Sequence, residues 1–375
     1  MDRRFKVEIA NSWEAFAPRW TQLQGRGVST PFQSATWLNA WYGAFCESTE
    51  IEPVLVAVMD AHSGHDVLLL PLVRRPTGRL RSIEFADLWT ADYNAPVIGP
   101  GAPSSEDECQ ALWNEIVNVL PQADIVRFTK MPFEVRGVAN PLARLKGTRL
   151  SDMRGHVVHL PDRWEDYIQS LNSSVRKAFR RRWRRFQEHN NAHLFCVDGV
   201  QDAQRVLAVL RAQQSSRLDA LGTRHIFDQR DYIRFYEQYV TEGVANGTVV
   251  LTALVVGNRI IATFLAVADG YSCVLIRSSQ LWNDEWTSLG LGKLIIERTM
   301  ELLHQRGYRS FDLSIGNFAY KLDFRVQPIP LYDYHQTRTL RAIPAACRER
   351  TWGILQKYPR IANSIRSARQ FTFSA

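Results

Sequence analysis

The chain has 375 residues, of which 45% are hydrophobic and 22% are charged, a composition typical of a soluble globular protein with two domains or one large domain. Neither a secretory signal nor a membrane-spanning helix is expected, because no apolar run follows the basic N-terminus and the apolar run over residues 248–268 is interrupted by Gly257, Asn258 and Arg259. The net charge of +8 favours an anionic partner, and five scattered cysteines without a CxxC pair indicate a reducing cytoplasm and no metal.

Residues 52–131 predict a hairpin, a long loop, a helix and a strand, in this order. The hairpin is formed by the β-rich runs EPVLVAVMD and HDVLLLPLVRR, which flank a loop at Gly64. The long loop passes through ADYNAPVIGPGAP and leads to a helix within SSEDECQALWNEIVNVL. The run ADIVRFTKM predicts the strand that follows.

Residues 175–186, VRKAFRRRWRRF, predict a strongly basic amphipathic helix. Seven of these residues are basic, and Val175, Phe179, Trp183 and Phe186 recur at helical spacing to form an apolar seam. One interpretation is a solvated helix face that packs on the core through this seam. The other is that so many like charges need an anion, such as a phosphate, a lipid headgroup or RNA, and basic faces beside Trp and Phe suit anionic membrane surfaces.

The second half of the chain repeats the order of the first. From residue 248, TVVLTALVVGNRIIATFLAVADGYSCVLIRSS contains three β-rich runs separated by the tight-turn dipeptides Gly257-Asn258 and Asp269-Gly270, which predicts an antiparallel meander. A helix within TSLGLGKLIIERTMELL and the strand YRSFDLSIG follow. The repeated order predicts a duplicated α/β unit with a boundary near residues 145–160.

The two helices of this repeat differ at their N-termini. In the first, Ser104 or Ser105 can cap the helix, and the acidic residues 106–108 occupy the first turn, where they interact favourably with the helix dipole. In the second, Thr287 or Ser288 can cap the helix, but no acidic residue follows. The first helix start would therefore repel a phosphate, whereas the second could accept one.

A phosphate-binding helix start is accordingly predicted for six residues: Ser288, Leu289, Gly290, Leu291, Gly292 and Lys293. Glycines allow close approach of a phosphate to the backbone N–H groups, and the lysine adds a positive charge. The alternative is that the glycines only let the helix pack closely on the sheet. Neither a Walker nor a Rossmann fingerprint is present in the sequence.

Four segments carry a resemblance to a known family: PFQSATWLNAWYGAF, SLNSSVRKAFRRRWRRF, RFYEQYVTEGVANGTVVLTALVVGNRIIATFLAV and SLGLGKLIIERTMELLHQRGYRSFDLSIGNFAYKLDF. They are similar to the double-domain, CelD-like (cellulose-biosynthesis-type) branch of the GNAT acyl-CoA N-acyltransferases, which is distantly related to the Fem-type aminoacyl transferases. The resemblance covers roughly residues 30–325.

The resemblance implies an α/β (α+β) fold with tandem GNAT-like domains, each a mostly antiparallel central sheet flanked by helices. A degenerate GNAT-like domain is expected over residues 1–150 and the acyl-CoA-binding catalytic domain over residues 151–340. Residues 341–375 are expected to form a basic and aromatic helical tail.

Acyl transfer from a thioester to an amine needs a neutral amine, a stabilised oxyanion and a proton for the leaving thiolate. Asp312 and Ser314 lie on the same side of the predicted strand, so Asp312 is a candidate base, with a purely structural carboxylate as the alternative. Tyr320 can return a proton to sulfur. The resemblance implies that Lys321 stabilises the oxyanion or binds a phosphate, where a solvated loop lysine would otherwise be expected.

The acceptor site is predicted from residues of both halves. Asp92 and Tyr93, in the long loop of the first half, are placed like acceptor-site residues in a cleft between the domains, although ordinary turn residues are the alternative. Arg176 and Arg180 of the basic helix, and Asn317 after the last strand, are the other candidates.

The resemblance implies an acyl-CoA-dependent N-acyltransferase without a metal. Its acceptor would be the amine of a sugar or lipid intermediate, such as a sphingoid-type or polysaccharide precursor, at the cytoplasmic membrane face. We expect a cytoplasmic protein, with peripheral attachment to the inner membrane through residues 175–186 as an option, and no nucleic-acid partner. The alternatives are an aminoacyl-tRNA-dependent Fem-type transferase and a non-catalytic GNAT-like binding module.

Overall fold

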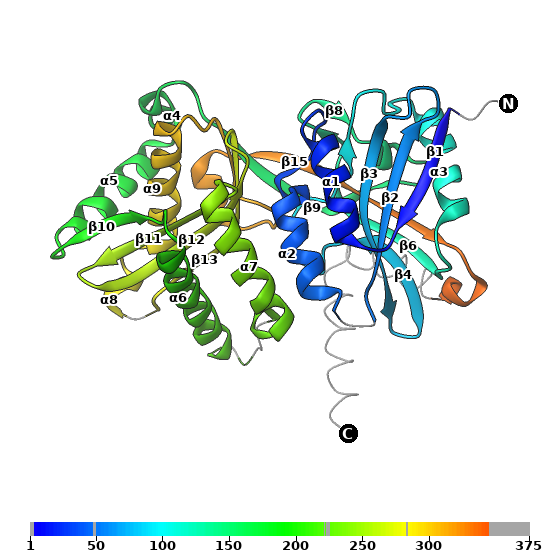
Figure 1. Cartoon of the computed structure of the whole chain (residues 1–375). Helices are drawn as coiled ribbons and strands as arrows, with labels where there is room; N and C mark the ends of the chain where they lie inside the picture. The colour runs from blue at the N-terminus through cyan, green and yellow to red at the C-terminus, as the bar shows by residue number, and fades with distance from the viewer. Residues whose placement is uncertain (1–3, 48–49, 221, 223–225, 283, 345–375) are drawn as a thin grey trace.

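A computed structural model describes residues 4–47, 50–220, 222, 226–282 and 284–344 (Figure 1). One mixed, mostly antiparallel sheet of 13 strands runs through these residues. Its strands are β1 (Phe5–Ala10), β2 (Glu52–Asp60), β3 (Asp66–Thr77), β4 (Leu80–Phe85), β5 (Val97–Ile98), β6 (Ile125–Pro132), β9 (Arg149–His159), β10 (Ala192–Cys196), β11 (Val249–Val256), β12 (Arg259–Ala268), β13 (Ser272–Gln280), β14 (Ser310–Asp312) and β15 (Gln327–Thr337). A separate two-stranded sheet pairs β7 (Glu134–Val135) with β8 (Val138–Ala139).

Helices cover both faces of the large sheet (Figure 1). The α-helices are α1 (Trp13–Gln24), α2 (Ala35–Phe45), α3 (Glu106–Val119), α4 (Trp164–Ser170), α5 (Ser173–Gln187), α6 (Val200–Asp219), α7 (Arg230–Asn246), α8 (Asp284–Thr287) and α9 (Leu291–Gln305). Short 3₁₀ helices are η1 (Pro31–Gln33), η2 (Pro141–Arg144), η3 (Ile226–Asp228), η4 (Ala319–Phe324) and η5 (Leu340–Ala342).

The strand order shows the predicted duplication. It runs β1-β2-β3-β4-β6-β15-β9-β14-β13-β12-β11-β10, so each half contributes an antiparallel meander followed by a parallel neighbour, β4 with β6 and β13 with β14. The α/β fold predicted from the sequence, with tandem units, is confirmed.

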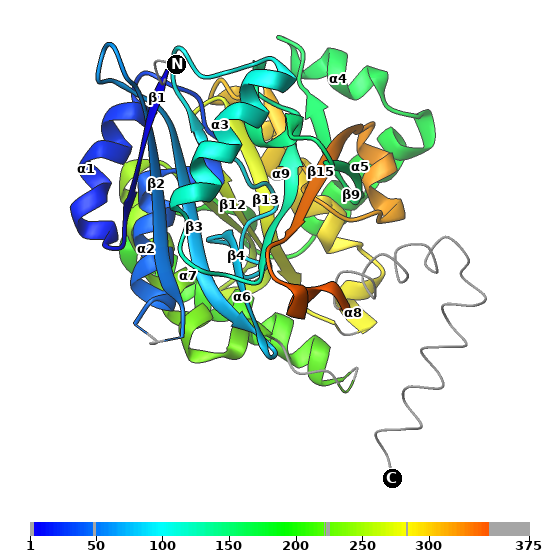
Figure 2. The same cartoon turned by 90° about the vertical axis from the view of Figure 1, so that its right-hand side faces the viewer.

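The two halves exchange their last strands. β9 follows the first unit along the chain but pairs with β14 of the second, and β15 follows the second unit but pairs with β6 of the first. β9 and β15 pair with each other in the middle of the sheet (Figure 2). The boundary between residues 150 and 151 stays a prediction, because the sheet continues across it.

The predicted meander of the second half is confirmed. β11, β12 and β13 pair in antiparallel fashion, and Gly257 and Gly270 take the positive φ values, 58° and 83°, that their tight turns require. In the first half, β4 was not predicted. Its sequence LRSIEF is short and carries two charged residues, so the hydrophobic pattern alone assigned it to the loop.

The helices α2 and α7 pack against each other where the halves meet. The indole of Trp37 lies 4.9 Å from the ring of Phe235 and 4.7 Å from that of Tyr239, measured between centroids, and all three side chains are fully buried. Burial of each such side chain stabilises the fold by about 1.5–3 kcal/mol. This aromatic contact helps to hold the two halves in one fixed arrangement.

The two helix starts differ as predicted, because the first turn of α3 carries three acidic residues and that of α9 carries none, but the cap of α9 is not the predicted one. Ser105 caps α3 by accepting a hydrogen bond from the N–H of Glu108 at 3.4 Å. The second helix, however, is not capped by Thr287 or Ser288. It begins at Leu291, after Gly290 in the left-handed conformation that glycine adopts without strain.

The basic helix is confirmed as α5, in which Phe179 and Phe186 are buried and the other two seam residues are partly buried. Among the described helices, none combines the length and the apolar character needed to span a membrane. The predicted tail falls outside the described residues from position 345 onward.

Candidate functional site

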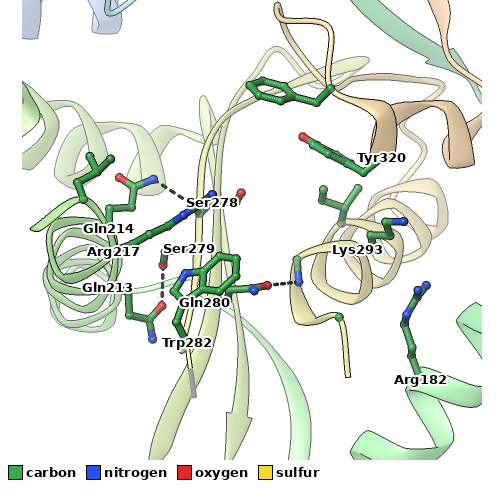
Figure 3. A pocket seen from close by; sticks show the side chains of 15 residues that line it. Arg182, Gln213, Gln214, Arg217, Ser278, Ser279, Gln280, Trp282, Lys293 and Tyr320 are labelled. Carbon is green, nitrogen blue, oxygen red and sulfur yellow. Dashed lines mark hydrogen bonds between the residues drawn. The ribbon is translucent and has the colours of Figure 1, made fainter. Parts of the chain in front are cut away.

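A cavity of about 630 Å³ lies between α6, the end of β13 and the start of α9 (Figure 3). The strand order explains why it exists. β13 and β14 pair only from Ser272 to Val274, against Ser310 to Asp312, and then diverge. From Leu275 onward, no described strand pairs with that edge of β13, whose other edge is covered by β12. The cavity is therefore bordered by a strand edge that can hydrogen-bond an extended ligand.

The predicted phosphate-binding helix start borders this cavity, but protein groups already occupy part of it. Gly290, Gly292 and Lys293 line the cavity. The side-chain oxygen of Gln280 accepts the backbone N–H of Gly292 at 2.6 Å, and the Lys293 ammonium forms a 2.5 Å ion pair with Asp323. The expectation that this turn offers its backbone N–H groups to a phosphate is thus wrong for the N–H of Gly292, and the Lys293 ammonium lies beside the turn, as predicted, but in an ion pair.

The remaining residues of the predicted turn do not face the cavity with their side chains. Leu289 and Leu291 are buried in the core of the second half, and Ser288 is exposed ahead of the helix. Hydrophobic packing of the two leucines fixes where α9 begins. In this part of the turn only the backbone would be available to a ligand.

Two arginines that the sequence analysis did not select line the cavity. Arg182 of α5 is half-buried, has no ion pair or hydrogen bond with any described residue, and has its pKa lowered by burial. Its Nε lies 3.0 Å from where a side-chain carbon on Gly290 would sit, and the φ of 62° at Gly290 favours glycine at this position. Arg217 of α6 lies over the exposed indole of Trp282, 4.6 Å from the ring centroid.

Tyr320 and Lys321 point in different directions. Tyr320 lines the cavity, and burial raises the pKa of its phenol, which therefore holds its proton at neutral pH (Figure 3). Lys321 is buried, and its ammonium donates to the backbone carbonyls of Ser314 at 2.9 Å and Ile315 at 2.8 Å. Burial lowers the pKa of Lys321 to about 8.

A buried polar cluster lies beside Lys321 and includes residues from both halves. Tyr93 donates a 2.7 Å hydrogen bond to one oxygen of Asp312, and the backbone N–H of Ser314 donates to the other at 2.6 Å. The Ser314 hydroxyl donates to Asp92. Burial raises the pKa of both Asp92 and Asp312 to about 6. The structure thus brings together four predicted site residues that are far apart in the sequence: Asp92, Tyr93, Asp312 and Lys321.

One aromatic residue connects this cluster to the cavity. Phe318 lines the cavity, and the Lys321 ammonium lies 5.5 Å from its ring centroid. The ring of Phe318 is also stacked with that of Tyr320, with the centroids 6.1 Å apart. A group bound in the cavity beside Tyr320 would be separated from the buried cluster by little more than the Phe318 and Lys321 side chains.

The predicted acceptor residues of the basic helix do not belong to this site. Arg176 and Arg180 lie on the opposite flank of α5 and line a smaller cavity together with Glu297 and Glu301. Arg176 also donates to backbone carbonyls at the end of α4. Asn317 is exposed and lines none of the cavities described above.

The helical periodicity of α5 indicates that Arg182 and Arg176 lie on different flanks of the helix, so Arg182 could have been considered as a candidate from the sequence. Arg182 lies on one flank of the apolar seam and Arg176 on the other, because positions six apart on a helix point in directions about 120° from each other. Which flank faces a ligand depends on where α9 packs. That contact joins residues far apart in the sequence, so periodicity alone does not decide between the flanks.

Comparison with known proteins identifies the fold. Residues 173–322 match the model of the acetyltransferase (GNAT) domain. A FemX crystal structure superposes with a TM-score of 0.59 at 10% identity, covering 88% of this chain and 97% of that one. The C-terminal domain (DUF2156) of an Agrobacterium fabrum protein assigned as a lysylphosphatidylglycerol synthetase superposes with a TM-score of 0.55 at 14% identity, covering 91% and 96%. A Bacteroides thetaiotaomicron protein of unknown function gives 0.52 at 10% identity, covering 89% and 100%.

These findings define the class of the protein as one with the GNAT acetyltransferase fold. The match covers the unit that contains α9, β13 and the cavity, and the similar solved structures extend over both halves of the chain. No curated protein matches the sequence. Within the described residues, no group of three or more histidine, cysteine, aspartate or glutamate side chains is arranged to hold a metal ion.

Proposed function

We propose that the chain is an acyl-CoA-dependent N-acyltransferase of the CelD-like branch, and that the cavity beside β13 binds the acyl-CoA. The observation that supports this most directly is the unpaired edge of β13 beside the glycine turn of α9, near which lies Arg182, a cation that forms no ion pair with a described residue. The open strand edge suits an extended ligand that contains amide groups. The helix start and the arginine suit a ligand that carries negative charge.

The chemistry of coenzyme A fits these three features. The pantetheine arm carries amide groups, which an open strand edge can hydrogen-bond as it would another strand. The pyrophosphate would lie at the start of α9, near Arg182 and Arg217. A cavity of about 630 Å³ is of the size that binds a cofactor-sized molecule.

The proposed roles of the catalytic residues follow from where each side chain lies. Tyr320 lines the cavity with its proton retained, so it is placed to protonate the thiolate that leaves. Asp312, with a pKa near 6, is ionised at neutral pH and would take the amine proton through a water. Lys321 holds the carbonyls of Ser314 and Ile315 in place and supplies positive charge beside both carboxylates, which makes it a positioning residue.

The acceptor is proposed to be an amine of a sugar or lipid intermediate, met at an anionic membrane surface. The supporting observation is α5, whose seven basic side chains form no ion pair with any described residue. Exposed apolar side chains lie beside them at the cavity, namely Trp282 and Phe318. Cations beside exposed aromatic residues suit an anionic lipid surface.

Calorimetric titration tests the proposal. We expect coenzyme A, acetyl-CoA and a long-chain acyl-CoA to bind with affinities that differ according to the chain accepted. Absence of binding for all three would refute the proposal. Turnover with any amine acceptor would exclude the alternative of a non-catalytic binding module.

The basic face of α5 also supports a second candidate, an aminoacyl-tRNA-dependent transferase of the Fem type. Seven cations that form no ion pair with a described residue suit an RNA backbone as well as a lipid surface. This candidate predicts that the protein retains tRNA on a filter at low salt and loses it steeply as salt rises. No retention at low salt would remove it.

A further inference from the structure

A second cavity, of about 360 Å³, lies in the middle of the molecule on the side of the first half. It covers one face of neighbouring strands: residues at alternate positions of β6 (Arg127, Thr129), β15 (Asp333, His335) and β9 (Ser151, Met153) line it. The loop that follows β4 closes it from above with Asp87, Leu88, Trp89 and Asn94. We call it the central cavity.

The charges of the central cavity largely balance one another. Glu84 forms ion pairs with Arg75 and Arg127, and Asp87 forms one with the buried ammonium of Lys130 at 2.6 Å. Since these carboxylates already have cationic partners, the cavity offers little net charge to a ligand. This favours a neutral polar molecule over a cation or an anion.

One buried polar atom in the lining of the central cavity has no partner. Asn94 is 1% exposed, and its amide nitrogen donates to Asp87 at 3.0 Å and to the carbonyl of Thr129 at 3.1 Å. Its amide oxygen accepts no hydrogen bond from any described group. This oxygen is buried beneath the cavity surface, so a molecule in the cavity would meet it only after the Asn94 side chain turns. An unsatisfied buried acceptor costs about 1–3 kcal/mol, which favours such a turn when a donor binds.

The mouth of the central cavity carries an exposed tryptophan on a strained backbone. Trp89 is 64% exposed, and it and Leu88 both have positive φ, 67° and 45°, which non-glycine residues rarely adopt. The loop is fixed in this conformation because Tyr232 donates to the carbonyl of Leu88 at 2.7 Å and Trp41 donates to that of Asp87 at 3.2 Å. Strain that the surroundings maintain is typical of ligand-binding positions.

From these observations we propose that the central cavity binds an uncharged, hydroxyl-rich ring of monosaccharide size. The apolar C–H face of such a ring would stack on the indole of Trp89, and a hydrogen bond from one hydroxyl to the oxygen of Asn94 would require that side chain to turn toward the cavity. Other hydroxyls would both donate to and accept from the polar lining. Because a hydroxyl can both donate and accept a hydrogen bond, it suits a lining that contains both acceptors and donors.

The position of the central cavity relates it to the proposed reaction. Ser151 and Met153 line it, and Gly155, the next position on the same face of β9, lies directly under the hydroxyl of Tyr93. The end of the cavity is therefore separated from the Tyr93–Asp312 hydrogen bond by about two residues of β9, or roughly 7 Å. We propose that the bound ring is part of the acceptor. This identification rests on the proposed function, whereas the proposal that a ring binds in the central cavity does not.

The test uses glucose, glucosamine and N-acetylglucosamine as probes with the full-length protein, and saturation-transfer NMR as the measurement. Binding of at least one sugar is expected, and Trp89→Gly is expected to weaken it more than about tenfold. Glycine accepts the positive φ at this position, so the melting temperature should not fall. Trp282→Ala, which removes the exposed indole at the other cavity, is the matched control and should leave sugar affinity unchanged.

Titration of coenzyme A into the same samples separates the two proposals. If none of the three sugars binds, or if Trp89→Gly and Trp282→Ala weaken sugar binding equally, the central cavity is not a sugar site, whatever the result with coenzyme A. If sugars bind in a Trp89-dependent manner but coenzyme A does not, the sugar site stands and the acyl-CoA proposal falls.

Discussion

The hydroxyl of Tyr93 donates a 2.7 Å hydrogen bond to Asp312 across 219 positions of sequence. One partner belongs to the loop after β4 in the first half, and the other ends β14 in the second half. Both side chains are buried, so the bond forms where water does not compete. It therefore fixes the candidate base relative to the first half of the molecule.

Tyr93→Phe should destabilise the protein in a pH-dependent way. The substitution removes a donor to a buried carboxylate, which costs about 1.5–3 kcal/mol when the carboxylate is ionised. It should also raise the pKa of Asp312 further, because the Tyr93 hydrogen bond is one of the contacts that lower it. Urea denaturation should show a larger loss at pH 7.5 than at pH 5.

Tyr42→Phe provides the control for this experiment. The hydroxyl of Tyr42 donates to the carbonyl of Leu72 at 3.2 Å, a neutral buried bond within the first half. Its loss should cost about 1 kcal/mol at either pH. Equal, pH-independent losses in the two variants would show that Tyr93 makes an ordinary structural hydrogen bond.

Asp92 should make the folded protein less stable as the pH rises from 4 to 6. Its pKa is about 6 in the folded protein, above the ordinary value of 3.8, so the folded state binds more protons than the unfolded state between these values. The free energy of unfolding then falls through this window and stays lower above it. A shift of this size corresponds to a free-energy change of at most about 3 kcal/mol, because the Asp92 carboxyl is only partly buried.

Asp92→Asn removes this contribution while keeping an oxygen that can accept from Ser314. The wild-type protein should therefore lose stability relative to Asp92→Asn between pH 4 and pH 7. Denaturation curves of both proteins across this range measure the difference. A difference that stays constant with pH would mean that the pKa of Asp92 is not raised in the folded protein.

Arg182→Gln should weaken coenzyme A binding more than about tenfold, or 1.4 kcal/mol. Removing a half-buried cation without a carboxylate partner among the described residues should leave the melting temperature unchanged or higher, since burial disfavours its charge. Arg180→Gln removes the same charge from the opposite flank of the same helix and serves as the control. Equal effects of the two substitutions on affinity would indicate a general charge effect instead of a contact at the cavity.

Gln280→Ala should increase the affinity for coenzyme A. The Gln280 side chain accepts the Gly292 N–H, one of the donors that a phosphate at the start of α9 would use. Removing it frees that donor and costs the unliganded protein one hydrogen bond, about 1 kcal/mol. Calorimetry should show a severalfold lower Kd, and an unchanged or higher Kd would place the phosphate elsewhere.

Local sequence signals predicted much of the fold but only part of the site. The meander, α3 with its serine cap and the amphipathic α5 were predicted because their periodicity and turn residues lie within single segments. The contact of Gln280 with Gly292 was not, because a strand and a helix must first be placed side by side. The exchange of β9 and β15 likewise depends on the assembly of the whole sheet.

Asp92 and Tyr93 were predicted to bind the acceptor, and Asp312 and Lys321 to act in catalysis. The structure places these four side chains together. The direction in which Lys321 points was not predictable, because it depends on the carbonyls that the end of β14 exposes. Their catalytic roles stay predictions.

The basic face of α5 should bind the protein to anionic vesicles through specific positions. Arg181 and Arg185 are exposed, and neither has an ion-pair partner among the described residues. Each cation near an anionic surface contributes about 1 kcal/mol, so Arg181→Gln/Arg185→Gln should reduce partitioning onto phosphatidylglycerol vesicles about thirtyfold. Arg259→Gln/Arg306→Gln removes the same charge from exposed positions on β12 and after α9 and should have little effect. Cosedimentation at physiological salt measures both variants. Equal losses in the two variants would mean that net charge alone drives binding. If the wild-type protein does not bind the vesicles, the anion that α5 binds is not a lipid surface.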